Sequence, residues 1–154
     1  DIDGGAVAFL QKKLNLDADG ISDLLNKKSG VLGITELSSD MREVEAACEK
    51  GDPKAILSMK MYNYRIKKYI GAYAAAMGGV DIIVFTAGVG ENQWSTRQEA
   101  CEGLEFLGVK IDKELNKGLR GVEKVISTAD SKVTVCIIPT DEELMIATDT
   151  MELL

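Results

Sequence analysis

The stretch that decides the fold of this chain is Val80-Asp-Ile-Ile-Val-Phe-Thr-Ala-Gly-Val-Gly-Glu-Asn92. Its first part, Ile82 to Phe85, is a β-branched and aromatic run typical of a strand covered on both faces. Gly88 and Gly90 then precede a helical pattern, and because glycine has no Cβ atom, the backbone there can approach a ligand closely. Ligands of open α/β sheets bind at the carboxyl ends of strands. The stretch therefore indicates a nucleotide site, and a plain tight turn is the alternative.

Helical patterns fill the first half of the chain. Apolar residues recur at helical spacing over 6–14 and again over 21–25, which predicts two short helices, and residues 30–34 are expected to form an apolar loop. A third helix is predicted over 41–48 after a polar capping segment. The longest helix is expected over 52–77, with an aspartate cap followed by proline at its first position.

The second half of the chain adds strands. After the glycine turn, Ser95 or Thr96 is expected to cap a helix. Strands are predicted over 124–127 and 133–138, and a final helix with its aspartate cap over 141–153. A strand, a helix and a strand in succession predict a parallel pair. The predicted fold class is α/β, helix-rich, with a small and mainly parallel sheet.

Composition excludes several classes of function. The 154 residues carry 18 basic against 25 acidic side chains, a formal charge of −7, which argues against nucleic acid as a partner. No apolar run approaches the roughly 20 residues that cross a bilayer, so we expect no membrane insertion and a cytoplasmic setting. Histidine is absent, which removes Ser-His-Asp and Cys-His catalysis and His-containing zinc sites.

The three cysteines, Cys48, Cys101 and Cys136, lie far apart within apolar patterns. Such thiols are typically reduced and pack as small hydrophobic groups. A catalytic cysteine is the alternative, although no histidine exists to form a thiolate pair with it. We therefore expect buried thiols.

Several segments together resemble the acetate kinase (acetokinase) family. Phe85 to Asn92 resembles the family signature F-T-[GA]-G-[IV]-G-E-N, and further matches follow the family's order: Asp1-Ile-Asp3, Lys27 to Ile34, Ser38 to Arg42, Cys101 to Gly108 and Ile138 to Leu144. The resemblance covers essentially this whole sequence but only the C-terminal portion of a family member. It implies the superfold of sugar kinases, Hsp70 and actin, in which two ribonuclease-H-like domains close on ATP. We expect residues 1–154 to be a C-terminal fragment of the second domain.

The resemblance also implies a chemistry. Family members transfer the γ-phosphoryl group of ATP to acetate, giving acetyl phosphate and ADP, with Mg²⁺ or Mn²⁺, and they work mainly by positioning and charge neutralisation. By resemblance, four turn residues would contact the adenosine and its near phosphate: Gly88, Val89, Gly90 and Asn92. A homodimer paired through the long helix is expected. Propionate or butyrate kinases remain alternatives, as does a non-catalytic ATP-binding or dimerisation module.

Asp40, Met41 and Arg42 would flank the base and ribose by the same resemblance. The Arg42 guanidinium can stack on adenine, and the Asp40 carboxylate can accept a hydrogen bond from ribose or base. The alternative is that Asp40 is only a helix cap and Arg42 only a surface charge.

Glu142 is the expected metal ligand, directly or through water. The match to the family's I-P-T-N-E-E-L stretch places its carboxylate at the carboxyl end of a strand, where Mg²⁺ would find a hard oxygen ligand. The alternative is that Asp141, Glu142 and Glu143 merely suit the positive end of a helix dipole. The chain departs from the family at Asp141, where asparagine is usual, and the added charge could alter metal affinity.

No catalytic residue is assigned to this chain. The family's catalytic histidine, its substrate-side arginines and its N-terminal phosphate contacts have no counterpart in the sequence. Acetate would therefore be bound by a portion outside these residues. We expect this polypeptide by itself not to make acetyl phosphate at a meaningful rate.

Overall fold

A computed structural model describes residues 2–153 and divides them into two compact units, one up to Tyr62 and one from Asn63 onward. Each unit is described by itself below. Asp1, the first residue of the segment 1–3 matched above, lies outside the described residues. None of the helices among residues 2–153 is long and apolar enough to span a membrane.

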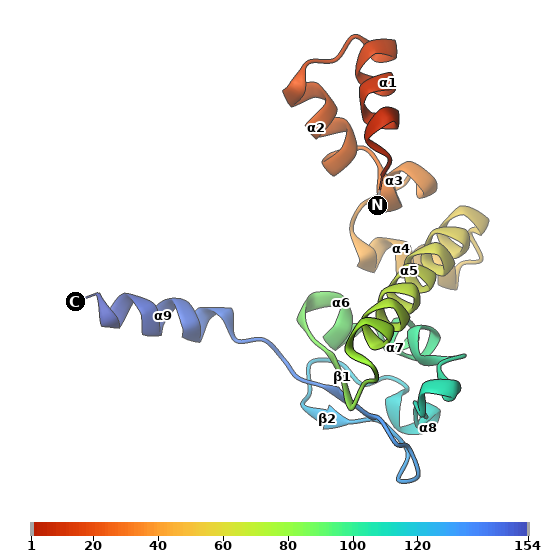
Figure 1. The fold of residues 1–154 in the computed structure, drawn as a ribbon, viewed down its shortest axis with the longest axis vertical. Helices are drawn as coiled ribbons and strands as arrows, with labels where there is room; N and C mark the ends of the chain where they lie inside the picture. Colours follow the sequence, from red (N-terminus) through yellow and green to blue (C-terminus); the bar gives the residue numbers. More distant parts are fainter. Residues whose placement is uncertain (1, 154) are drawn as a thin grey trace. The chain divides into compact units, whose positions relative to one another are not determined.

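The N-terminal unit is entirely helical. It holds α1 (Gly4–Leu14), α2 (Ala18–Lys27), α3 (Gly30–Thr35), α4 (Met41–Glu49) and the first part of α5 (Pro53–Met77), and α1 and α2 lie side by side (Figure 1). Its core forms where α4 meets the start of α5, around Val44, Ala55 and Met59. The predicted helices are confirmed within a few residues of their ends.

Residues 30–34 form the helix α3, so the predicted loop is wrong. Gly30 has a left-handed φ of +63°, and the chain turns there before it re-enters a helix. Val31 packs against the core around Val44. Because tertiary packing routinely outweighs local propensity, this short glycine-containing segment is helical.

Aspartate begins most of the helices. A capping carboxylate accepts a hydrogen bond from a backbone N–H that has no partner within the helix, which stabilises the start of the helix. The aspartates that do this are Asp3, Asp17, Asp40, Asp52, Asp112 and Asp141. The predicted caps of α4, α5 and the last helix are therefore confirmed.

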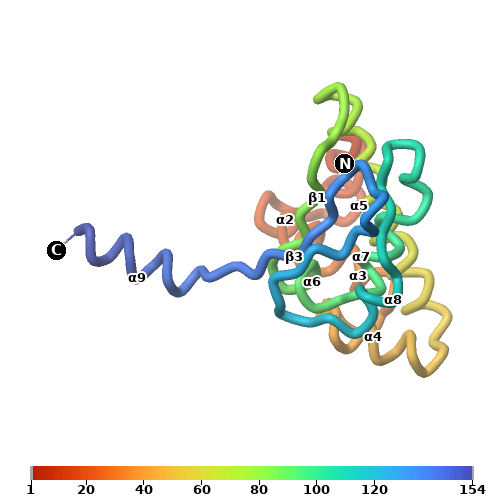
Figure 2. The backbone as a smooth tube through the Cα atoms, turned by 90° about the horizontal axis from the view of Figure 1, so that it is seen from below, coloured from red at the N-terminus to blue at the C-terminus, as the bar shows by residue number. Residues whose placement is uncertain are grey.

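The C-terminal unit combines a small sheet with helices that pack on one of its faces. After α5 come β1 (Ile82–Phe85), α6 (Ala87–Asn92), α7 (Trp94–Cys101), the 3-10 helix η1 (Glu105–Leu107), α8 (Lys113–Asn116), β2 (Lys124–Val125), β3 (Thr134–Ile137) and α9 (Glu142–Glu152) (Figures 1 and 2). The predicted helix start at Ser95 or Thr96 is wrong. The glycine turn is itself helical, and α7 begins directly after Gln93.

The sheet has three strands in the order β1-β3-β2. β1 and β3 pair in parallel, with Ile83 opposite Val135 and Phe85 opposite Ile137, which confirms the predicted parallel pair. β2 pairs antiparallel to β3, with Val125 opposite Cys136. The sheet is therefore mixed rather than mainly parallel, because the short connection between β2 and β3 reverses the chain, as in a hairpin.

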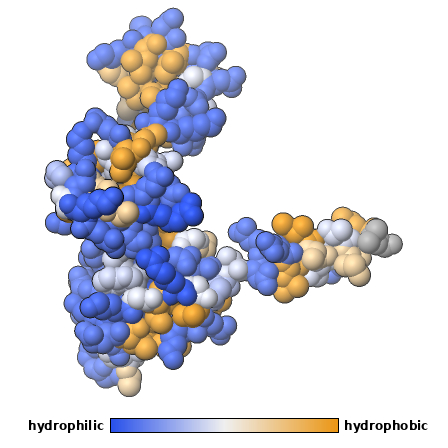
Figure 3. Space-filling model, turned by 180° about the vertical axis from the view of Figure 1, so that it is seen from behind, coloured by the Kyte–Doolittle hydropathy of each residue, from blue (hydrophilic) through white to orange (hydrophobic). Residues whose placement is uncertain are grey.

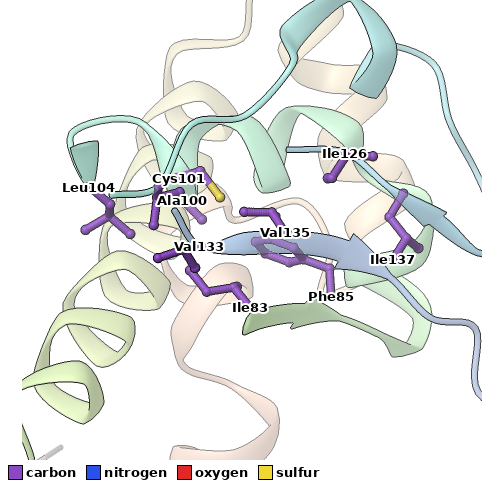
Figure 4. Packing of buried hydrophobic residues seen from close by; sticks show 10 residues of the cluster. Ile83, Phe85, Ala100, Cys101, Leu104, Ile126, Val133, Val135 and Ile137 are labelled. Atoms are coloured by element: carbon purple, nitrogen blue, oxygen red, sulfur yellow. The ribbon is translucent and has the colours of Figure 1, made fainter. Parts of the chain in front are cut away.

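One face of the sheet carries the core of this unit. Ile83, Phe85 and Val135 pack with Ala100 and Cys101 of α7, and Figure 4 shows these side chains gathered between sheet and helix. The other members of the cluster are Leu104, Val109, Ile126, Val133 and Ile137. Parallel β1–β3 pairing thus fixes the strand ends from which the glycine turn and the Pro139 segment depart.

The opposite face of the sheet is open. Ile82, Val84 and Val125 are 58%, 46% and 53% exposed, so the expectation that Ile82 to Phe85 is covered on both faces is wrong for the described residues. An apolar run predicts burial but does not say what covers each face. Apolar side chains are also exposed along α9, such as Met145 and Ile146 (Figure 3).

Two of the three thiols are buried, as expected. Cys101 lies in the core, and burial raises the pKa of its thiol to about 12. Burial also raises the pKa of Cys136. Cys48 is half-buried beside Val44. The two buried thiols are protonated at neutral pH and act as packing groups.

Candidate functional site

The glycine turn sits at the carboxyl end of β1 and forms the six-residue helix α6. Thr86 precedes it in extended conformation, and Ala87 then adopts a left-handed φ of +57°. A residue with a Cβ atom rarely adopts this conformation, and its backbone strain persists only where the surroundings hold it. The turn is therefore a constrained piece of backbone.

The two glycines of the turn differ in what surrounds them. A Cβ atom on Gly90 would lie 3.1 Å from the carbonyl carbon of Phe85, so Gly90 is needed for α6 to fold back on the strand. A Cβ atom on Gly88 would meet nothing within 4 Å. Only Gly88 therefore leaves open space in front of the turn, where a ligand can approach.

Asn92 closes the turn from its far end. Its side-chain amide nitrogen Nδ2 donates to the Gly88 carbonyl at 2.9 Å. Val89 is half-buried between them, and its carbonyl accepts from the backbone N–H of Gln93. The four predicted turn residues thus form one small hydrogen-bonded unit.

A buried arginine donates hydrogen bonds to the turn from the protein interior. The Arg97 side chain is fully buried, and its Nη1 donates to the carbonyls of Gly90 at 2.8 Å and Glu91 at 3.0 Å. Nη2 donates to the Leu119 carbonyl and Nε to Asn116 Oδ1, both at 2.8 Å. Burial lowers the pKa of Arg97 to about 10, so the guanidinium remains charged at neutral pH. A charge so deeply buried is stable only when its donors are satisfied.

Arg97 is not among the residues predicted from the sequence motifs, although its position in the sequence carries a signal. Residues 97, 100, 101 and 104 share one face at helical spacing, and the last three are Ala100, Cys101 and Leu104 of the core. A charged side chain on the apolar face of a helix predicts a buried polar partner. Here those partners are carbonyls of the glycine turn.

Glu91 ties the turn to the segment after β3. Its Oε1 accepts from the backbone N–H of Thr140 at 2.7 Å and from the Thr140 hydroxyl at 3.0 Å. The backbone hydrogen bond from Thr140 lowers the pKa of Glu91 below its ordinary value. Thr140 stands two residues before Glu142, so this contact connects two predicted parts of the site that lie far apart in the sequence.

The predicted metal ligand lies at the start of α9. Asp141 caps this helix, because its Oδ1 accepts from the Leu144 N–H at 2.9 Å. Glu142 and Glu143 follow in the first turn, and both are exposed. Within residues 2–153 no three Cys, Asp or Glu side chains converge on a metal position. Mg²⁺ is usually bound by one or two carboxylates together with waters and substrate phosphates. The two glutamates fit that donor set.

Asp40, Met41 and Arg42 belong to the N-terminal unit, where α4 begins. Asp40 Oδ1 accepts from the Arg42 N–H at 2.9 Å, and Asp40 Oδ2 pairs with Arg42 Nη2 at 2.6 Å. The bound guanidinium lowers the pKa of Asp40 to about 2. The Arg42 side chain is 87% exposed, while Met41 packs in part against Val44. Asp40 is thus both a helix cap and an ion-pair partner.

Three surface hollows of the described chain involve other residues. The first, about 570 Å³, is formed by the N-terminal unit from Leu37 to Asp52. The others, about 410 and 520 Å³, lie in the C-terminal unit beside Glu123 to Ile138 and Met77 to Ile82. None of the three is lined by a predicted site residue.

Residues 1–148 match the model of the acetokinase family. This chain belongs to the acetokinase family. Over all 154 residues it is 70% identical to the acetate kinase of Phocaeicola vulgatus and 62% identical to that of Parabacteroides distasonis. The described fold is shared with the crystal structure of Porphyromonas gingivalis acetate kinase, with a TM-score of 0.92 at 58% identity over 99% of this chain.

Two solved structures of lower sequence identity share the same fold. Entamoeba histolytica acetate kinase matches all of this chain with a TM-score of 0.88 at 36% identity, and a propionate kinase from Francisella tularensis matches 96% with a TM-score of 0.83 at 35% identity. The chain spans 38% of the length of the two curated relatives named above and 37% to 40% of the three solved structures. The fold and the family are thus established together.

Proposed function

We propose that this chain forms the nucleotide-binding part of an acetate kinase, which transfers the γ-phosphoryl group of ATP reversibly to acetate. Membership of the acetokinase family and relatives named acetate kinase at 62% and 70% identity support this. The observation that carries the proposal is the glycine turn. It is open at Gly88, held from behind by Arg97 and linked through Glu91 to the segment before Glu142.

Gly88, Val89, Gly90 and Asn92 would meet the adenosine and its near phosphate. The open space in front of Gly88 supports this role, since only there can ligand atoms come against the backbone without displacing protein. Gly90 and Asn92 would contribute by shaping the turn, because both are engaged within it. Phosphoryl transfer depends on such positioning more than on covalent chemistry.

Arg42 would stack on the purine, and Asp40 would orient it. The Asp40 carboxylate already binds one edge of the guanidinium, while the exposed planar face remains available to a base. The hydrogen bond from ribose to Asp40 that the family resemblance implies would have to share this carboxylate with Arg42. Met41 would contact the nucleotide with the part of its side chain that is not packed.

Glu142 would hold Mg²⁺ or Mn²⁺ together with phosphate oxygens and water. The exposed carboxylates of Glu142 and Glu143 in the first turn of α9 support this role. The metal would neutralise charge on the phosphates of ATP. Acetate would bind to another part of the enzyme, and no residue of this chain is assigned to the chemical step.

The finer architecture is part of the same proposal. Residues 1–154 would belong to the second of two ribonuclease-H-like domains, and the rest of the enzyme would cover the open sheet face around Ile82 and Val84. A homodimer would pair along α5, where Leu57 and Met61 are 53% and 48% exposed. Apolar residues at this spacing on an open helix are typical of an interface.

Titration with Mg·ADP tests the proposal in the full-length protein that carries this chain. Filling the open space by Gly88→Val is expected to weaken Mg·ADP binding about tenfold or more, since a clash with the ligand replaces close backbone contact. Gly4→Val is the matched control, because a Cβ atom there also meets nothing within 4 Å. A wild-type protein that neither binds Mg·ADP nor turns over ATP with acetate would refute the proposal.

A propionate kinase is the second candidate, because one such enzyme shares this fold. The higher identity to acetate kinases favours acetate. The ratio of kcat/KM for acetate and propionate decides between the two. A ratio well below one would assign the parent enzyme to propionate.

A further inference from the structure

Hydrogen bonds from Arg97, Gly121 and Thr140 meet at one residue of the glycine turn, Glu91. Its backbone carbonyl accepts from Arg97 Nη1 at 3.0 Å and from the backbone N–H of Gly121 at 3.1 Å. Its side-chain carboxylate accepts twice from Thr140. Glu91 therefore joins the buried interior, the turn and the chain that leaves the sheet after β3.

The buried residues that support the Glu91 carbonyl, Arg97 and Asn116, are rigidly held. Arg97 and Asn116 are both fully buried, and Asn116 in turn donates to the Trp94 carbonyl at 2.8 Å. All four acceptors of Arg97 are neutral oxygens. A guanidinium has fixed donor directions, so carbonyls bound to it are held in position as well as in distance.

The Thr140 segment, which the Glu91 carboxylate contacts, differs because no buried side chain of residues 2–153 anchors it. Thr140 is exposed, and the segment after Pro139 leads into α9, whose described residues are all exposed. In the described chain the Glu91 carboxylate is thus the side chain that ties this segment back to the turn. A carboxylate accepting from both N–H and O–H forms charge-assisted bonds, which are stronger than neutral ones.

We propose that Glu91, anchored by Arg97, is a positioning residue that fixes the Thr140 to Glu142 segment against the glycine turn. The proposal rests on the proposed function, since it assigns nucleotide contact to the turn and metal to Glu142. In the assembled site, nucleotide and metal binding are then energetically coupled through Glu91. Glu91 itself contacts neither ligand.

The first test needs no ligand. Hydrogen exchange of the Thr140 backbone amide is measured in the full-length protein and in Glu91→Ala, with Glu91→Gln as the conservative variant. Glu91→Ala is expected to speed exchange at Thr140 about tenfold or more, while Glu91→Gln stays close to wild type because its amide oxygen can still accept. Unchanged exchange at Thr140 in Glu91→Ala overturns the proposal, whatever the protein binds.

The second test measures the coupling. In wild type, Mg²⁺ should tighten ADP binding, and in Glu91→Ala this tightening should shrink about tenfold while ADP binding without metal changes little. Thr140→Val removes the hydroxyl but keeps the N–H, so its effect should be intermediate. Glu105→Ala is the control, because Glu105 Oε1 also accepts a backbone N–H, that of Gly103 at 3.1 Å.

The outcomes separate the two proposals. Wild type without ADP binding refutes the nucleotide function, and the exchange measurement still decides the role of Glu91. Wild type with ADP binding and a Glu91→Ala variant with full coupling refutes the positioning role alone. Equal loss of coupling in Glu105→Ala would also refute it, because the effect would then be a general one of removing a surface carboxylate.

Discussion

The two groups of predicted nucleotide residues are built in opposite ways. The glycine turn is held from the interior, through a fully buried arginine whose hydrogen bonds reach two of its carbonyls. Asp40 and Arg42 lie at the surface and are held by their own ion pair, by the start of their own helix and by the Ser38 hydroxyl, which accepts from the Asp40 N–H at 3.0 Å. The turn is therefore fixed from the interior, while the Arg42 guanidinium is oriented by a single exposed carboxylate, that of Asp40.

Replacing Arg97 should lower the free energy of unfolding more than any other change proposed below. Arg97→Met removes the Arg97 donors from the carbonyls of Gly90 and Leu119 and from the fully buried Asn116 Oδ1, while the Glu91 carbonyl keeps the Gly121 N–H. Buried acceptors that lose their donor cost about 1 to 3 kcal/mol each. We expect the free energy of unfolding to fall by about 3 kcal/mol or more, measured by urea denaturation. Arg42→Ala, the exposed counterpart, should change it little. Equal losses in both variants would show that the turn is not held from behind.

The two glycines sharpen the comparison within the turn itself. Gly90→Ala places a Cβ atom 3.1 Å from the Phe85 carbonyl carbon and should lower the free energy of unfolding by about 1 to 3 kcal/mol. Gly88→Ala meets open space and should be close to neutral for stability. Thermal denaturation of both variants measures this difference. If Gly88→Ala were the more destabilising variant, the assignment of the open side of the turn would be reversed.

Replacing Ala87 by glycine should have a smaller effect and should stabilise the protein. Its φ of +57° is unfavourable for a residue with a Cβ atom, and its exposed methyl group contributes little packing. Ala87→Gly should therefore raise the free energy of unfolding by up to about 1 kcal/mol, despite the greater freedom of glycine in the unfolded chain. A matched Ala72→Gly change, at an exposed position inside α5, should destabilise instead.

The sequence predicted the elements of this molecule better than their surroundings. Helix caps such as Asp52 and Asp141 and the parallel β1–β3 pair follow from local chemistry, and all are confirmed. The helical state of residues 30–34 depends on packing against Val44, and the open side of Ile82 depends on what lies next to the sheet. Neither can be read from a short stretch of sequence.

The same limit applies to the candidate site. The motif residues of the turn were recognisable because glycine spacing reports backbone geometry directly. The apolar face that Arg97 shares with Ala100, Cys101 and Leu104 indicates that Arg97 is buried, but its partner Leu119 lies 22 residues away in sequence. Glu91 acts through Thr140, 49 residues away, and no local pattern reveals that contact. The supporting residues of a site are thus harder to predict than its ligand-facing backbone.

The smallest expected effect is the pH dependence of the Asp40 and Arg42 pair. The pKa of Asp40 is lowered from 3.8 to about 2 by the hydrogen bond to Arg42, so the folded state favours the charged carboxylate. Its contribution to stability is therefore complete above pH 4 and is lost as the pH falls toward 2. Carboxyl NMR titration of Asp40 should show this low midpoint in wild type and a higher one in Arg42→Ala, where the backbone N–H of residue 42 still donates to the carboxylate. An ordinary midpoint in wild type would mean that Arg42 is not held by Asp40, and the orientation proposed for purine stacking would lose its support.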